Sequence, residues 1–311
     1  MAQQGDRPPV ELETTVALGN VKGRIDHLAV DLARKRLFIA ELENNSLGIV
    51  DLDRGTLLHR ISGLSEPQGV GYIPSTDMIV VANGGDGTVR FFRGEDFAAT
   101  AQLKLGEDAD NVRVSARPEK VYIGYGSGAL AAIDPVSLAT MREITLPTHP
   151  ESFQLSPSLR RIFVNLPDAH AIAVVDRDAT RPRESWATGK YRGNFAMALD
   201  DQNQRIVVAY RKPAKLSVLD MRTGATIAGR DTCGDVDDVF TDARRRRVYA
   251  TCGEGFIDVF DSRSGYKRLA RIATRRGART SLFIPALDRL AVAVRASETE
   301  PAALWIYRPS P

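Results

Sequence analysis

Long apolar runs and cysteines are the features that this sequence lacks most clearly. No run approaches the ~20 apolar residues that a membrane-spanning helix needs, so we expect no membrane span. Only two cysteines occur in 311 residues, Cys233 and Cys252. Their spacing fits neither a zinc ribbon nor a CxxC redox motif. Two possibilities stay open for them, one disulfide or two buried thiols.

A strong charge of one sign is also absent, as are the short motifs of common enzyme classes. The formal net charge of +3 is too small by itself to indicate a polyanionic partner. There is no GxSxG, P-loop or HExxH motif, and no GxGxxG that opens a helix. The glycine-rich "NGGDG" (83–87) joins two predicted strands, which favours a hairpin turn over a phosphate-binding loop.

The N-terminus, "MAQQGDRPPVELETT", has no apolar stretch of signal-peptide type. Its polar, proline-containing lead-in resembles the start of a mature exported protein to which a methionine has been added. We therefore expect a periplasmic or secreted protein, with residues 1–9 as a disordered lead-in. The alternative is a cytoplasmic protein with a short disordered tail.

The chain has a repeat of about 42 residues, and such a period decides the fold. Seven segments share the form apolar run, polar turn, apolar run, as in "HLAVDLARKRLFIAE". The segments are 27–41, 69–83, 111–125, 152–166, 196–210, 238–252 and 280–294. A third apolar run follows most of them and ends in an aspartate that suits the first position of a turn. These aspartates are Asp51, Asp134, Asp176, Asp220 and Asp261.

Four short strands in each repeat are typical of a β-propeller blade. The sequence therefore predicts an all-β protein, a seven-bladed β-propeller with four antiparallel strands per blade. The last repeat lacks a fourth strand, whereas residues 10–18 alternate like a strand and have no blade of their own. We expect 10–18 to complete the last blade and close the ring. The prediction is one domain, 10–311, and a monomer.

The hairpins of the form V-x-D-x-x-x-x-R and the third strands that end in Asp, such as "LGIVDLDRG", resemble the YVTN-type β-propeller repeats of bacterial surface-layer and periplasmic proteins. The resemblance covers residues 20–308 and implies the propeller fold. WD dipeptides are absent, and no double glycine recurs from repeat to repeat as it does in kelch propellers. Because the motif residues are turn and core positions, the resemblance says little about function.

In propellers the first strand of each blade lines the central channel, and ligands bind most often where the chain enters that strand. The residues just before the seven segments are Asp26, Gln68, Asp110, Glu151, Phe195, Asp237 and Arg279. Further polar residues at this level are His27, Asn111, His149, Asn194 and Asp238. We expect these side chains, Phe195 excepted, to form an acidic, histidine-containing site at the channel mouth.

Crowded carboxylates raise one another's pKa unless a cation neutralises them. One hypothesis is a divalent metal held by Asp26, Asp110, Glu151 and Asp237. Oxygen ligands favour calcium or magnesium, while the histidines leave room for zinc or manganese. A small organic ligand bound without metal is the second hypothesis. The third is a solvated mouth in which the acids bond to neighbouring backbone and to Arg279.

Enzymatic propellers offer a comparison for this mouth. Gluconolactonase-type propellers hold calcium with one glutamate, two asparagines and one aspartate, for which Glu151, Asn111, Asn194 and Asp237 are the available residues. Streptogramin-lyase-type propellers use paired histidines and a glutamate, for which His27, His149 and Glu151 are available. The surrounding motifs match neither class. A metal-dependent lactonase, hydrolase or lyase is therefore an alternative to a binding protein, with His27, His149 and Arg279 as catalytic candidates.

The turns between first and second strands lie on the opposite face and are repeatedly basic. They contain Lys35, Arg36, Lys120, Arg160, Arg161, Arg205, Arg244 to Arg247 and Arg289. We expect these side chains to be solvated hairpin ends, and the arginine run to be an ordinary turn of this kind. A protein-binding or nucleic-acid-binding scaffold is the second alternative, although stacking aromatics are missing from these turns. Cys233 and Cys252 are expected on the ligand-binding face, where a disulfide would indicate an oxidising compartment.

Overall fold

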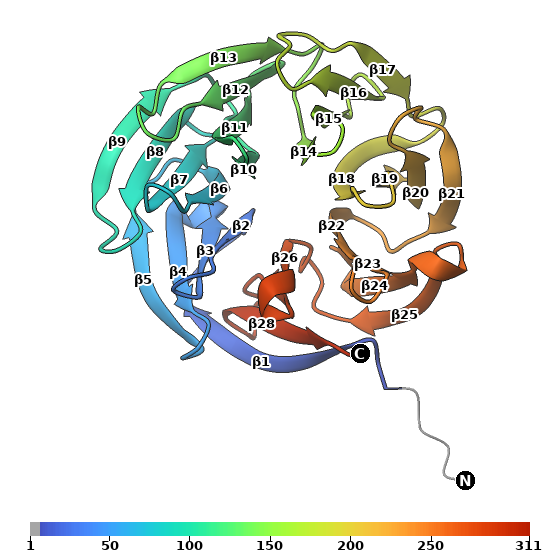
Figure 1. Ribbon diagram of the computed structural model, residues 1–311. Helices are drawn as coiled ribbons and strands as arrows, with labels where there is room; N and C mark the ends of the chain where they lie inside the picture. The colour runs from blue at the N-terminus through green and yellow to red at the C-terminus, as the bar shows by residue number, and fades with distance from the viewer. Residues whose placement is uncertain (1–6) are drawn as a thin grey trace.

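Seven four-stranded antiparallel sheets surround a central channel in the computed structural model, which describes residues 7–311 (Figure 1). The prediction of a seven-bladed β-propeller is confirmed. Blade 1 contains β2 (Leu28–Asp31), β3 (Arg36–Glu41), β4 (Ser46–Asp51) and β5 (Thr56–Ser62). Blade 2 contains β6 (Pro67–Ile73), β7 (Met78–Asn83), β8 (Thr88–Arg93) and β9 (Ala99–Lys104). Blade 3 contains β10 (Val112–Ala116), β11 (Glu119–Tyr125), β12 (Ala129–Ile133) and β13 (Thr140–Thr145).

The remaining blades follow the same order from the channel outwards. Blade 4 contains β14 (Ser152–Ser156), β15 (Arg161–Leu166), β16 (Ala171–Asp176) and β17 (Glu184–Ala187). Blade 5 contains β18 (Arg192–Asp200), β19 (Arg205–Lys212), β20 (Ala214–Asp220) and β21 (Thr226–Asp231). Blade 6 contains β22 (Val236–Asp242), β23 (Arg247–Cys252), β24 (Phe256–Asp261) and β25 (Lys267–Ala273). Blade 7 contains β26 (Ser281–Ile284), β27 (Arg289–Val294), β28 (Ala302–Pro309) and β1 (Val10–Gly19).

The N-terminal strand β1 is the outermost strand of blade 7. It pairs antiparallel with β28, from Val10 opposite Pro309 to Gly19 opposite Ala302. Both ends of the described chain therefore belong to one sheet. This shared sheet closes the ring, because blade 7 is completed by the strand that precedes blade 1. Residues 1–6 of the expected lead-in lie outside the residues that the structure describes.

Helical structure within residues 7–311 is confined to three short 3₁₀ turns. They are η1 (Leu42–Asn44), η2 (Ser262–Ser264) and η3 (Pro285–Leu287). Across these residues, no helix has the length and apolar character needed to cross a membrane.

Apolar side chains form seven clusters, and each cluster lies between two neighbouring blades. The cluster between blades 7 and 1 contains Val16 and Leu18 from β1, Leu37 and Ile39 from β3, and Leu304 from β28. Burying one such side chain contributes roughly 1.5–3 kcal/mol. Blade stability therefore depends on the contact with both neighbours, and β1 belongs to the cluster that joins the last blade to the first.

The predicted aspartate turns are observed after four of the five third strands. Asp51, for example, accepts hydrogen bonds from the backbone N–H groups of Asp53 and Arg54 at 3.0 and 2.9 Å. Asp134 and Asp220 make the same two contacts, and Asp261 accepts one such bond, from the backbone N–H of Arg263. Asp176 differs, because its carboxylate faces the guanidinium of Arg183 at 3.3 Å instead.

Several basic residues opposite the channel mouth form ion pairs with nearby acids. The ion pairs are Lys35–Asp53 at 2.9 Å, Arg160–Asp178 at 2.8 Å, Arg205–Asp220 at 3.2 Å and Arg289–Glu13 at 2.8 Å. This pairing weakens the case for a nucleic-acid surface on that face, because counterion release requires unpaired cations.

The arginine run 244–247 is not simply a solvated turn, which corrects the sequence-based expectation. Arg245 is buried, and its guanidinium contacts both carboxylate oxygens of Asp288, at 2.6 and 2.7 Å. Its Nε also donates to the carbonyl oxygen of Ser310 at 2.7 Å. Arg247 donates to the carbonyls of Ser310, at 2.7 Å, and Pro9, at 3.2 Å. These two arginines fasten both ends of the chain to blade 6.

We predict that Arg245→Ala destabilises the propeller by about 3–5 kcal/mol, because it leaves Asp242 and Asp288 without their buried cation. Urea unfolding followed by tryptophan fluorescence measures the change. Arg244→Ala is the matched control, since the Arg244 side chain is 75 % exposed and its loss is expected to cost less than about 1 kcal/mol. Equal stability of the two variants would contradict this account.

Candidate functional site

The mouth of the central channel is a cavity of about 320 Å³ lined mainly by polar side chains. The structure brings ten of the predicted site residues to this cavity. They are Asp26, His27, Gln68, Asp110, Asn111, His149, Glu151, Asp237, Asp238 and Arg279. Carboxylates outnumber arginines among its lining residues, six to four, and this excess sets the electrostatics of the site.

Irregular backbone at the start of the inner strands aims the ring of side chains into the mouth. In blades 2, 5 and 6 the register shifts at Gln68, Phe195 and Asp237, the same position of the repeat. A β-bulge of this kind leaves one residue unpaired and redirects its side chain. Asp235, two residues before Asp237, adopts the left-handed conformation with φ of 57°, which aspartate tolerates better than most residues.

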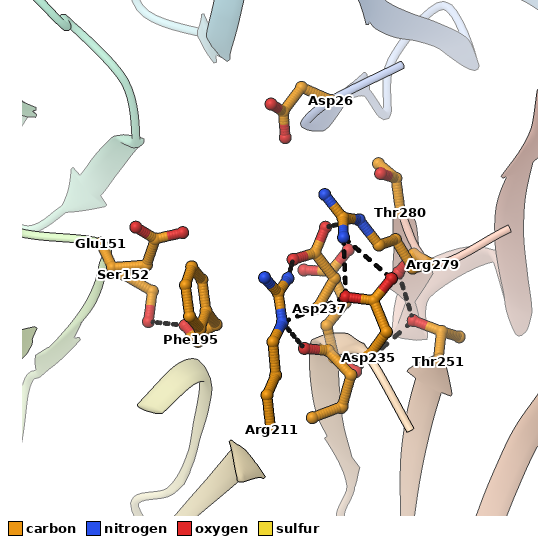
Figure 2. A network of polar contacts seen from close by, with 12 residues as sticks. Asp26, Glu151, Ser152, Phe195, Arg211, Asp235, Asp237, Thr251, Arg279 and Thr280 are labelled. Carbon is orange, nitrogen blue, oxygen red and sulfur yellow. Dashed lines mark hydrogen bonds and ion pairs between the residues drawn. The ribbon is translucent and has the colours of Figure 1, made fainter. Parts of the chain in front are cut away.

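Blades 5, 6 and 7 meet at the mouth in a network of alternating charges (Figure 2). One oxygen of Asp237 pairs with Arg211 of β19, and the other lies 3.0 Å from Nε of Arg279. Arg279 also pairs with Asp235 at 2.7 Å, and Arg211 lies 3.3 Å from Asp235. The Arg211 guanidinium covers the ring of Phe195 at 3.7 Å, a cation–π contact. Asp237 is therefore neutralised by two arginines.

The predicted ring did not include Arg211 or Arg113, and both line the cavity. Arg211 follows directly after the fifth repeat segment, and the corresponding residues of the other blades are Leu42, Gly84, Gly126, Pro167, Gly253 and Arg295. The position that follows each repeat segment is thus arginine in blades 5 and 7, and comparing the blades at this position would have indicated basic groups at the mouth. Arg113 lies on β10, and nothing in the repeat distinguishes it from other residues of the inner strands.

His27 connects blades 1 and 3 at the mouth. Its Nε2 lies 3.4 Å from Oδ1 of Asp110. Burial lowers the pKa of His27, but the carboxylates of Asp110 and Asp26 outweigh burial and raise this pKa to about 9. His27 is therefore cationic at neutral pH and serves as a partner for acids. Asp26 is buried beside it, and burial together with Asp110 and Asp237 raises the pKa of Asp26 to about 6.

Glu151 is the acid with the fewest partners. Among residues 7–311, no side chain or backbone N–H forms a hydrogen bond or ion pair with its carboxylate, and Figure 2 shows it apart from the arginine network. Burial, together with Asp110 and Asp237, raises the pKa of Glu151 to about 8. Burial likewise raises the pKa of Asp238 to about 7, although Asp238 accepts a hydrogen bond from the backbone of Ser281 at 2.7 Å. The mouth thus holds more carboxyl groups than its cations can neutralise.

His149 and Gln68 converge on a third acid, Asp108. The amide of Gln68 donates to Asp108 at 3.0 Å, and Nδ1 of His149 lies 3.5 Å from the same carboxylate. The same nitrogen is 2.7 Å from the carbonyl oxygen of Gly126, so it carries the proton in that contact. His149 and His27 therefore have separate acidic partners and do not form a pair.

The prediction for Asn194 needs correction. Asn194 does not line the mouth; it is buried, and its amide donates to the carbonyl of Ala171 at 2.9 Å. Asn111 does line the mouth and donates to the backbone carbonyl of Glu151. The four residues considered for calcium binding therefore do not converge. Within residues 7–311, no group of three or more His, Cys, Asp or Glu side chains is arranged to hold a metal ion.

Cys233 and Cys252 form a disulfide with Cα atoms 5.8 Å apart. Both residues are buried, and they join the loop before β22 to the end of β23. That loop carries Asp235 and leads into Asp237. The disulfide therefore fixes the chain on which two acids of the arginine network lie.

No family model and no curated protein matches this chain. Among solved structures, it is similar to a chain of the hydrazine synthase of Kuenenia stuttgartiensis, with 14% identity and a TM-score of 0.76. The match covers 88% of this chain and 94% of that one. It is also similar to a chain in a crystal structure of the mitotic checkpoint complex, with 14% identity, a TM-score of 0.80 and 98% and 95% coverage. At such identity the matches show the β-propeller fold alone, and membership of the YVTN-type repeat family stays a prediction.

We predict that Glu151→Gln stabilises the protein at alkaline pH. Because the folded-state pKa of about 8 exceeds the ordinary value of 4.5, Glu151 contributes stability below pH 4.5 and loses it as pH rises through 8. The variant should therefore exceed the wild type by about 2–4 kcal/mol at pH 9 and by little at pH 4. Urea unfolding at several pH values measures this difference.

Glu95→Gln serves as the control for that comparison, because Glu95 is exposed on the outer turn of blade 2. It should change stability by less than about 0.5 kcal/mol at either pH. If the free energy of unfolding of Glu151→Gln did not exceed that of the wild type at pH 9, the Glu151 carboxylate would not be destabilised by the lack of a neighbouring cation.

Proposed function

We propose that this chain is an exported ligand-binding β-propeller that captures a small organic cation at the channel mouth. The observation that carries the proposal is the carboxylate of Glu151, which faces a polar cavity without a partner, while Asp26 and Asp110 line the same cavity. A ligand ammonium group there would supply the missing charge and donate hydrogen bonds to carboxylate oxygens. The disulfide supports export to an oxidising compartment.

An organic cation suits this wall better than a resident metal ion. Both oxygens of Asp237, one of the expected metal ligands, already contact arginines. The remaining expected ligands, Asp26, Asp110 and Glu151, come from three different blades. A metal would require them to converge at about 2–2.6 Å from one point, whereas an ammonium group can bind through the Glu151 carboxylate alone while the other acids contribute their charge.

The test is calorimetric titration of the purified protein with butylamine at pH 7.5. We expect saturable binding, with affinity reduced at least tenfold in Glu151→Gln because a charge-assisted hydrogen bond is lost. Asp168→Asn is the matched control, since Asp168 is exposed in the loop between β15 and β16 and lies outside the cavity. It should bind like the wild type.

Parallel titrations with calcium, magnesium, zinc and manganese chlorides test the metal-dependent alternative. Saturable binding of one of these ions, lost in Glu151→Gln, together with no response to butylamine, would overturn the proposal in favour of a metal site.

A further inference from the structure

The central channel continues beyond the mouth into a second cavity of about 410 Å³. The inner strands of the blades line it, mostly with apolar side chains. Val30, Val114, Leu199, Phe240 and Leu282 are each only half-buried there, so part of their apolar surface faces the channel. Covering apolar surface of this kind with an apolar ligand group removes it from water, which makes the free energy of binding more favourable.

The two cavities adjoin each other, since six residues form walls of both. They are His27, Arg113, Gln154, Asp238, Val239 and Phe240. The polar members of this boundary have partners in the channel wall. His27 lies 3.4 Å from Asp110, the amide of Gln154 donates to Met197 at 2.9 Å, and Asp238 accepts from Ser281. Arg113 donates to the carbonyl of Val112 at 2.9 Å. The polar contacts of the channel are therefore concentrated at the mouth, and the exposed apolar surface of the channel lies in the second cavity.

We propose that the bound ligand is an amphipathic cation, with an ammonium group at Glu151, Asp26 and Asp110 and an apolar body beyond the boundary. This inference rests on the proposed function, because the charged group sets where the ligand is anchored. Along β22 the wall runs from Asp237 at the mouth to Thr241 in the second cavity, roughly 13 Å at 3.3 Å per residue. An apolar chain of several carbons fits that depth.

The test compares ethylamine, butylamine and hexylamine by calorimetric titration of the full chain. Each methylene that is fully buried should tighten binding by about fourfold. Because the channel is open, we expect hexylamine to bind at least tenfold more tightly than ethylamine. Hexanol, which has the same tail without the charge, should bind at least tenfold more weakly than hexylamine.

Two variants of the lower cavity separate this inference from the proposed function. Ala29→Phe adds a phenyl ring to the wall of the second cavity and reduces its volume, and Leu282→Asn makes the wall polar without adding volume. In either variant the ratio of hexylamine to ethylamine affinity should fall towards one. The second variant keeps the test decisive if the first does not fold.

Equal affinities for ethylamine and hexylamine in the wild type would overturn this inference and leave the proposed function standing. Hexanol binding as tightly as hexylamine would also overturn it, since the ligand would then need no charge. No binding of any amine would overturn the proposed function itself, and this inference with it.

Discussion

Contact between neighbouring blades is the constraint on which the rest of this structure depends. A four-stranded blade is too small to bury both of its faces alone, so each blade shares one apolar cluster with each neighbour. That arrangement is complete only when blade 7 meets blade 1. Strand β1 makes this possible, because it pairs with β28 while Val16 and Leu18 pack against blade 1. Arg245 and Arg247 then hold the chain ends in place.

Closure of the ring also creates the electrostatic problem at the channel mouth. Seven inner strands begin around one small cavity, so charges from different blades lie within a few ångströms of one another. Blades 5, 6 and 7 resolve this with the network of Arg211, Asp237, Arg279 and Asp235. On the other side of the mouth, Glu151 has no such partner among residues 7–311, and burial raises its pKa to about 8. This imbalance is what the proposed ligand would correct.

The 42-residue repeat predicted the fold in detail, because its alternating apolar runs and polar turns correspond directly to strands and turns. The column of residues before each inner strand, together with polar residues next to it, also identified ten residues that line the mouth. Periodicity does not report side-chain direction, which is why Asn194 was assigned to the mouth although it is buried against Ala171. The role of Arg245 was missed for a related reason. Its partners Asp288 and Ser310 are 43 and 65 residues away along the chain, and only the closed ring brings them together.

The most direct test of the central claim is the number of protons released when butylamine binds. At pH 7 most Glu151 carboxyls are protonated, so capture of an ammonium group should ionise them and release about one proton per ligand. Calorimetric titration in buffers with different ionisation enthalpies measures this number. The account predicts release near one proton at pH 7, almost none at pH 9, and clearly less at pH 7 in Glu151→Gln, in which Asp26 and Asp238 still have raised pKa values. Binding that releases no proton from the wild type at pH 7 would contradict it.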